Sequence, residues 1–168
     1  HMHTQSGGKL DFREIDQVFV PTEKSENHIN VGSCNGDFEL EEIVKNTNYK
    51  VKKFLNINEG GFDKISVLCS KESEKKNIWL LPNTISESKT KSFIDFQNDS
   101  TAKDIKLALR EGFKSIEHVK RYTTTGMATD QGKLSNMHAL GIIADTAGVK
   151  MGTLGTTTFR PPFTPLTF

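Results

Sequence analysis

Three short helical patterns follow one another between residues 100 and 147, and they constrain the fold more than any other part of the sequence. At the first, Ser100 or Thr101 can cap a helix, Thr101 and Asp104 have capping-box spacing, and Gly112 is a natural stop. Apolar residues recur every three or four positions, which predicts helices that share a core. The residues expected in this core are Ile105, Ala108, Leu109, Ile116, Val119, Met137, Leu140, Ile143 and Ala144.

The second and third patterns predict two further helices. Ser115 can cap the second, which ends near the cations Lys120 and Arg121. The third covers about Asn136 to Ala147. Together the patterns predict a small helical module at residues 95–150, made of three short helices joined by polar loops.

An earlier stretch has the order strand, glycine turn, helix. Residues 29–31 are β-like, Gly32 and Gly36 follow, and residues 38–44 have helical spacing. Doubly wound nucleotide domains use this order to bring a helix N-terminus to a ligand. The same glycines also suit ordinary helix–strand packing, and both interpretations stay open.

The middle of the chain predicts a β-hairpin. Residues 64–70 and 77–82 are apolar runs that flank a charged turn. Trp79 is expected on the apolar face of this hairpin, with stacking on a ligand as the alternative. The predicted fold class is α+β: a small module of three short helices, preceded by a β-hairpin and by an incomplete α/β nucleotide-domain tail.

The loop between the second and third helices is rich in groups that bind anions. Two adjacent cations are followed by threonine hydroxyls and turn-favouring glycines, and the third helix would direct the positive end of its dipole at this loop. Two plainer interpretations stay open: the cations interact with the dipole of their own helix, and the threonines form only a turn. The candidate anion-binding residues are Lys120, Arg121, Thr123, Thr124, Thr129, Gln131 and Lys133.

Composition excludes several function classes. A formal net charge of +1 offers no field that would hold nucleic acid or an anionic membrane. Cys34 and Cys69 are too few for a disulfide framework or a cysteine metal site, and no apolar run approaches the roughly 20 residues that span a bilayer. His118 and His138 lack ligand-spaced partners, and no nucleophile–base set is present. We therefore expect a cytoplasmic protein with no metal and no catalytic residue of its own.

Several motifs together carry a family resemblance. The stretches TQSGGKL, DFQND, VKRYTT, GMATDQGK and TTTFRPP closely resemble the α subunit of heterotetrameric sarcosine oxidase. The resemblance implies that the chain is a fragment of a longer subunit. Residues 3–50 would be the tail of its dinucleotide-binding region, residues 51–150 its third domain, and residues 151–168 the beginning of an aminomethyltransferase-like folate domain.

The helical module at residues 95–150 is also similar to the small iron–sulfur domain of bacterioferritin-associated ferredoxin. The cysteine positions of that domain hold Asp95, Gln97, Asp130 and Ser135 here. Because thiolates stabilise such clusters, the similarity implies a retained scaffold without an iron–sulfur cluster. The missing cysteines also favour sarcosine oxidase over related amine or opine oxidases. Asp95 and Asp130 are expected to make turn and cap hydrogen bonds, with a catalytic pair as the alternative.

The resemblance to sarcosine oxidase implies a part in the oxidative demethylation of sarcosine to glycine, with the chemistry in the β subunit. FMN would be attached to β at the α/β interface, in contact with the seven candidate residues above and with Arg160. NAD and tetrahydrofolate would bind elsewhere in the full-length subunit, and the β, γ and δ subunits would be partners. One alternative is a non-catalytic interaction module, which predicts no flavin contact at residues 120–133. The other is the same subunit of a related amine or opine oxidase.

Overall fold

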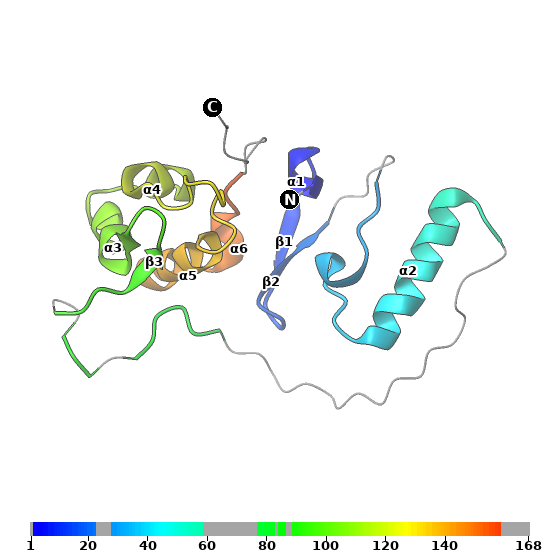
Figure 1. Cartoon of the computed structure of the whole chain (residues 1–168), viewed down its shortest axis with the longest axis horizontal. Coiled ribbons are helices and arrows are strands. Elements are labelled where there is room, and N and C mark those ends of the chain that lie inside the picture. The colour runs from blue at the N-terminus through cyan, green and yellow to red at the C-terminus, as the bar shows by residue number, and fades with distance from the viewer. Residues whose placement is uncertain (1, 23–27, 59–76, 83, 87–88, 159–168) are drawn as a thin grey trace. The chain divides into compact units, whose positions relative to one another are not determined.

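The chain separates into two compact units, unit 1 (residues 1–76) and unit 2 (residues 77–168). The structure is a computed structural model that describes residues 2–22, 28–58, 77–82, 84–86 and 89–158 (Figure 1). Two antiparallel hairpins and several short helices confirm the α+β class. Over these ranges, no helix is both long and apolar enough to cross a membrane.

Unit 1 combines a two-stranded hairpin with one long helix. The hairpin strands pair antiparallel, with Phe12 opposite Phe19 and their ring centroids 5.0 Å apart. The helix predicted around residues 38–44 is confirmed and continues to Leu55. The elements of unit 1 are α1 (Met2–Gln5), β1 (Leu10–Arg13), β2 (Val18–Pro21), the 3-10 turn η1 (Gly32–Asn35) and α2 (Leu40–Leu55).

The strand predicted at residues 29–31 is wrong, because these residues form no regular element. The polar groups of Asn30 bind side chains instead of a neighbouring strand. Lys50 Nζ donates to the Asn30 carbonyl (3.0 Å), and Asn30 Nδ2 lies 3.1 Å from His3 Nδ1. Without a strand beside it, a short β-like run has no ladder to join.

Unit 2 contains the predicted three-helix module, and the third helix has the predicted bounds. The capping box at Thr101 and Asp104 is confirmed, since each side chain binds the backbone of the other. Ser115 is the N-cap of the second helix, although its side chain makes no cap hydrogen bond. The elements are β3 (Phe93–Asp95), β4 (Ser100–Thr101), α3 (Ala102–Arg110), α4 (Ile116–Thr123), α5 (Asn136–Ala147) and α6 (Met151–Leu154).

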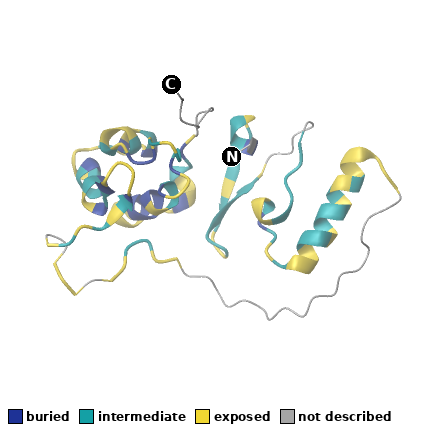
Figure 2. Cartoon of the chain, in the orientation of Figure 1, coloured by how far each residue is buried: buried dark blue, intermediate teal, exposed yellow. Residues whose placement is uncertain are grey.

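The core of unit 2 lies between α3, α4 and α5, where buried residues gather (Figure 2). Of the nine residues expected in this core, seven are buried, and Leu109 and Met137 are partly buried. Ala102, Ile105 and Ala108 recur every third position and define the buried face of α3, and Leu109 lies beside this face. The buried apolar residues are Ala102, Ile105, Ala108, Ile116, Val119, Ala139, Leu140, Ile142, Ile143, Ala144 and Met151.

The hairpin predicted in the middle of the chain is not confirmed. Residues 64–70 lie outside the described residues, and residues 77–82 form no strand. Trp79 packs instead on α5, where its ring meets His138 edge-on at 6.1 Å. A Cβ added at Gly141 would clash with the Trp79 indole. The indole therefore lies directly against the α5 backbone and takes the place of a side chain there.

Candidate functional site

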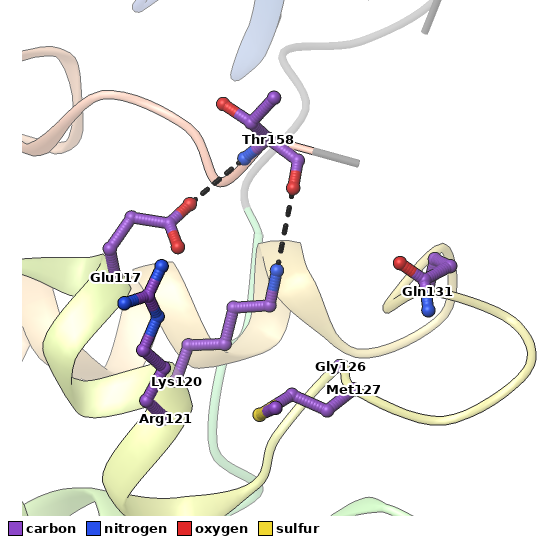
Figure 3. Close-up of a pocket in the computed structure, with 7 residues that line it drawn as sticks. All are labelled: Glu117, Lys120, Arg121, Gly126, Met127, Gln131 and Thr158. Carbon is purple, nitrogen blue, oxygen red and sulfur yellow. Dashed lines mark hydrogen bonds between the residues drawn. The ribbon is translucent and has the colours of Figure 1, made fainter. Parts of the chain in front are cut away.

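A pocket of about 660 Å³ lies in unit 2 beside the last turn of α4 (Figure 3). Three of the predicted site residues meet there: Lys120, Arg121 and Gln131. Two come from α4, and the third comes from the loop at residues 124–135 on the opposite wall. The described residues that line the pocket are Glu117, Lys120, Arg121, Gly126, Met127, Gln131 and Thr158.

The last turn of α4 supplies the positive charge of the pocket. Lys120 and Arg121 lie in this turn, and the helix ends at Thr123, followed by the C-cap residue Thr124 with a left-handed φ of 58°. Arg121 is exposed, and its side chain makes no hydrogen bond or ion pair with another described residue. Cations at a helix C-terminus are favoured by the helix dipole, so their position is compatible with the plainer interpretation as well.

The chain returns to α4 at Thr158 and forms a third wall. Glu117 accepts a hydrogen bond from the Thr158 backbone nitrogen (3.0 Å), and Lys120 Nζ donates to the Thr158 carbonyl (3.5 Å; Figure 3). Residues one helical turn apart thus bind both polar groups of a single backbone residue. We call these two hydrogen bonds the clamp at Thr158. They offset the charge of Glu117 and use one of the three N–H donors of Lys120.

The opposite wall is a tightly folded loop. Gly126 and Gly132 are buried and left-handed, with φ values of 70° and 75°. A Cβ at Gly126 would lie 3.1 Å from the Gly132 Cα and would also clash with the Asn136 carboxamide. Glycine is therefore required where the loop doubles back. No residue of α5 lines the pocket, so the pocket's charge comes from side chains and not from the dipole of that helix.

The predicted threonines do not line the pocket, and their hydroxyls have partners elsewhere. Thr123 Oγ1 donates to the Val119 carbonyl (2.8 Å), and Thr124 Oγ1 donates to the Thr123 carbonyl (2.7 Å). Thr129 Oγ1 accepts from Gln97 Nε2 (3.2 Å). Lys133 is exposed and also lies away from the lining. Arg160 is outside the described residues.

Three of the four positions that correspond to cluster cysteines, Asp95, Gln97 and Asp130, are joined by hydrogen bonds. Asp95 accepts three backbone hydrogen bonds, and the Asp130 backbone nitrogen donates to Gln97 Oε1 (3.3 Å). Asp130 itself accepts from Gly132 and Leu134 nitrogens at 3.1 and 3.4 Å. The expected turn and cap roles of Asp95 and Asp130 are confirmed. Ser135 is buried with no hydrogen-bond partner for its hydroxyl.

Four described lining residues were not among the predicted site residues: Glu117, Gly126, Met127 and Thr158. Met127 stands inside the predicted loop, but an apolar side chain gave no reason to include it. The meeting of Glu117 with Thr158 joins residues 41 positions apart, and no local pattern reports such a contact. Across the described part of the chain, no group of three or more His, Cys, Asp or Glu side chains has a metal-binding arrangement.

Comparison with known proteins covers both units. Residues 89–168 match the family described as the sarcosine oxidase A3 domain. The chain is 56% identical over 91 residues to the alpha subunit of sarcosine oxidase from Rhizobium meliloti (strain 1021), a match of 54% of this chain and 9% of that relative. It is 32% identical over its whole length to the alpha subunit of sarcosine oxidase from Corynebacterium sp. (strain U-96), of which it spans 18%.

A weaker likeness exists to one chain of the opine oxidase of Rhizobium meliloti (strain 1021). This match is 35% identical over 66 residues, which are 39% of this chain and 14% of that relative. The two sarcosine oxidase relatives are matched over longer stretches, and one over the full chain. The chain is therefore related to the sarcosine oxidase alpha subunit, of which it spans a small part that includes the A3 domain.

Proposed function

We propose that this chain is part of the alpha subunit of a sarcosine oxidase, and that unit 2 holds the phosphate of FMN at the interface with the beta subunit. The observation that carries the proposal is the convergence of Lys120, Arg121 and Gln131 on one pocket. The names of the relatives supply the oxidation of sarcosine. The family resemblance implies that this reaction is the oxidative demethylation of sarcosine to glycine. FMN, when bound, supplies electron transfer from the substrate side to oxygen.

The side chains present fit a phosphate group. Lys120 and Arg121 bring two positive charges, and Glu117, the one carboxylate among the described lining residues, is engaged with Thr158. The guanidinium of Arg121 presents a planar fork of donors that matches phosphate oxygens. Gln131 Nε2 donates to the Ala128 carbonyl (3.1 Å), which leaves its Oε1 to accept from a ribityl hydroxyl. Arg121 is therefore the main anion ligand in this proposal.

Other cofactors and partners follow from the same relationship. NAD and tetrahydrofolate are assigned to parts of the alpha subunit outside this chain, and the beta, gamma and delta subunits are its partners. Unit 2 holds no iron–sulfur cluster in this proposal, because the four matching positions carry no cysteine. The chain supplies binding and charge, while the partners supply the reacting groups.

The proposal is tested by Arg121→Ala in the assembled enzyme, with Arg110→Ala as the control. Arg110 is an exposed arginine of the same unit that lies outside the pocket lining. Arg121→Ala should lower FMN content or the flavin midpoint potential, by about 30 mV for each tenfold loss of preference for the reduced anion. Arg110→Ala should change neither. Unchanged FMN content and potential in Arg121→Ala would disprove the flavin role.

A second candidate is a non-catalytic interaction module. The clamp at Thr158 favours it, because Glu117 and Lys120 already have a structural task. The two functions are separated by titrating the labelled chain with FMN and following backbone amides. Saturable shifts centred on residues 120–133 support the flavin site. Shifts that appear only when the beta subunit is added assign the flavin site to the subunit interface, and no shift in either case supports the interaction module.

A further inference from the structure

Asp95 is the one buried acidic side chain among the residues that the structure describes, with 3% of its surface exposed. It lies at the end of β3, and its Oδ1 accepts from the backbone nitrogens of Gln97 (2.9 Å) and Asn98 (3.2 Å). These two bonds form the turn before β4. Its Oδ2 accepts from the backbone nitrogen of Gly126 at 2.7 Å, across 31 positions of sequence.

A buried carboxylate is expensive unless its oxygens are hydrogen-bonded. No described residue forms an ion pair with Asp95, so three backbone N–H groups compensate its charge. The turn needs only Oδ1, and Asn or Ser at this position would serve it. The second oxygen is used on the pocket wall, because Gly126 and its neighbour Met127 both line the pocket. Bonds to an ionised acceptor are about twice as strong as neutral ones.

We propose that Asp95 is a positioning residue for the anion pocket: its Oδ2 fixes Gly126, and so sets how far the loop wall stands from Lys120 and Arg121. The inference rests on the proposed function of the pocket. Asp95 does not itself line the pocket and does not touch the ligand. It acts through the backbone nitrogen of Gly126, which donates to its Oδ2.

Asp95→Asn isolates the bond to Gly126. The amide oxygen can keep both bonds of the turn, but the amide nitrogen then faces the Gly126 N–H, donor against donor. The matched control is Asp130→Asn. Asp130 also accepts two backbone hydrogen bonds in the same loop, but its donors, Gly132 and Leu134, do not line the pocket. Both variants remove one charge and one acceptor from the same part of the unit.

The test compares both variants in the assembled enzyme. With Asp95→Asn, the rate at which FMN is loaded during assembly of the enzyme should fall about tenfold, because a buried donor loses its acceptor. The flavin midpoint potential should also shift, whereas Asp130→Asn should leave both quantities within about twofold of the parent. Equal changes in the two variants would overturn the inference, as would an unchanged loading and potential in Asp95→Asn.

Amide resonances of the isolated chain show whether Asp95→Asn changes only the pocket wall or unfolds the unit. In Asp95→Asn the Gly126 amide resonance should move strongly, while the Gln97 and Asn98 amides stay near their parent positions. A collapse of all three signals would contradict a role that is confined to the wall. The inference and the proposed function fail in different ways. If Arg121→Ala weakens FMN loading and Asp95→Asn does not, only the positioning role is lost; if neither variant acts, the pocket is not the flavin site.

Discussion

The two units bury their side chains very differently. All eleven buried apolar residues of the described chain belong to unit 2, between Ala102 and Met151. Unit 1 has a longer helix, yet no residue of α2 is buried, and Leu40, Tyr49, Phe54 and Leu55 are exposed (Figure 2). Among the described residues of unit 1, His3 is the one buried polar side chain.

The difference shows that the length of a helix does not determine its stability. An isolated helix of about 15 residues is marginal in water, and most helical stability in proteins comes from packing of an apolar face. α3 and α4 are shorter than α2, but they share a core with α5. We therefore expect unit 2 to unfold as one cooperative body and α2 to respond little to its own substitutions.

The greatest loss of stability is predicted for a substitution in the core of unit 2. Ile105→Ala removes a fully buried side chain and should destabilise unit 2 by about 2–5 kcal/mol. Leu55→Ala, at an exposed position of α2, should change stability by no more than about 0.5 kcal/mol. Urea titrations read from amide signals of each unit measure both values. Similar losses in the two variants would remove the contrast between the units.

The second prediction compares the stability cost of alanine at one glycine of each unit. Gly141→Ala in unit 2 should cost about 1–3 kcal/mol, because the new methyl group would occupy the place of the Trp79 ring. Gly7→Ala in unit 1 meets no atom within 4 Å, but its φ of 86° adds backbone strain of about 1 kcal/mol.

The fluorescence of Trp79, the only tryptophan, reports the first change. A double-mutant cycle with Trp79→Ala should show coupling between the two sites. An uncoupled pair would mean that the ring does not lie on α5 in solution.

A third comparison concerns helix starts. Thr101→Ala removes the capping box of α3 and should cost about 1 kcal/mol. Glu39→Ala at the N-cap of α2 should cost only a few tenths, since Glu39 makes no side-chain cap bond. Thermal unfolding monitored by circular dichroism measures both, and a larger loss for Glu39→Ala would contradict the assigned caps.

The smallest expected effect lies at Thr157. Its hydroxyl is buried with no hydrogen-bond partner, so Thr157→Val should be neutral or slightly stabilising. Thr123→Val is the matched control, because that hydroxyl donates to the Val119 carbonyl and its loss should cost about 1 kcal/mol. Chemical denaturation of the two variants would decide, and a clear loss in Thr157→Val would indicate a bound water.

Where the sequence predicted the fold well, the signals were local. The capping box at Thr101 and the bounds of α5 depend on residues a few positions apart. The strand at residues 29–31 and the position of Trp79 depended on partners that no short window contains. Both errors, the strand at residues 29–31 and the position of Trp79, therefore come from contacts between residues that are far apart in the sequence.

The candidate site also shows the difference between local signals and long-range contacts. Lys120 and Arg121 were found because adjacent cations before a polar loop are a local signal, and Gln131 because it lies in that loop. The predicted hydroxyls of Thr123 and Thr124 are used by nearby backbone carbonyls, a competition that residue type alone does not reveal. Thr158 enters the pocket only because the chain returns to Glu117.

In the clamp at Thr158, Lys120 can bind either the Thr158 carbonyl or an anion in the pocket. Its bond to the Thr158 carbonyl is long, at 3.5 Å, and therefore weak. An anion that draws the ammonium group away releases this carbonyl, and an anion that leaves the bond intact is held beside a fixed Thr158. Ligand binding and the docking of Thr158 on α4 are thus thermodynamically linked, and each must change the other by the same factor.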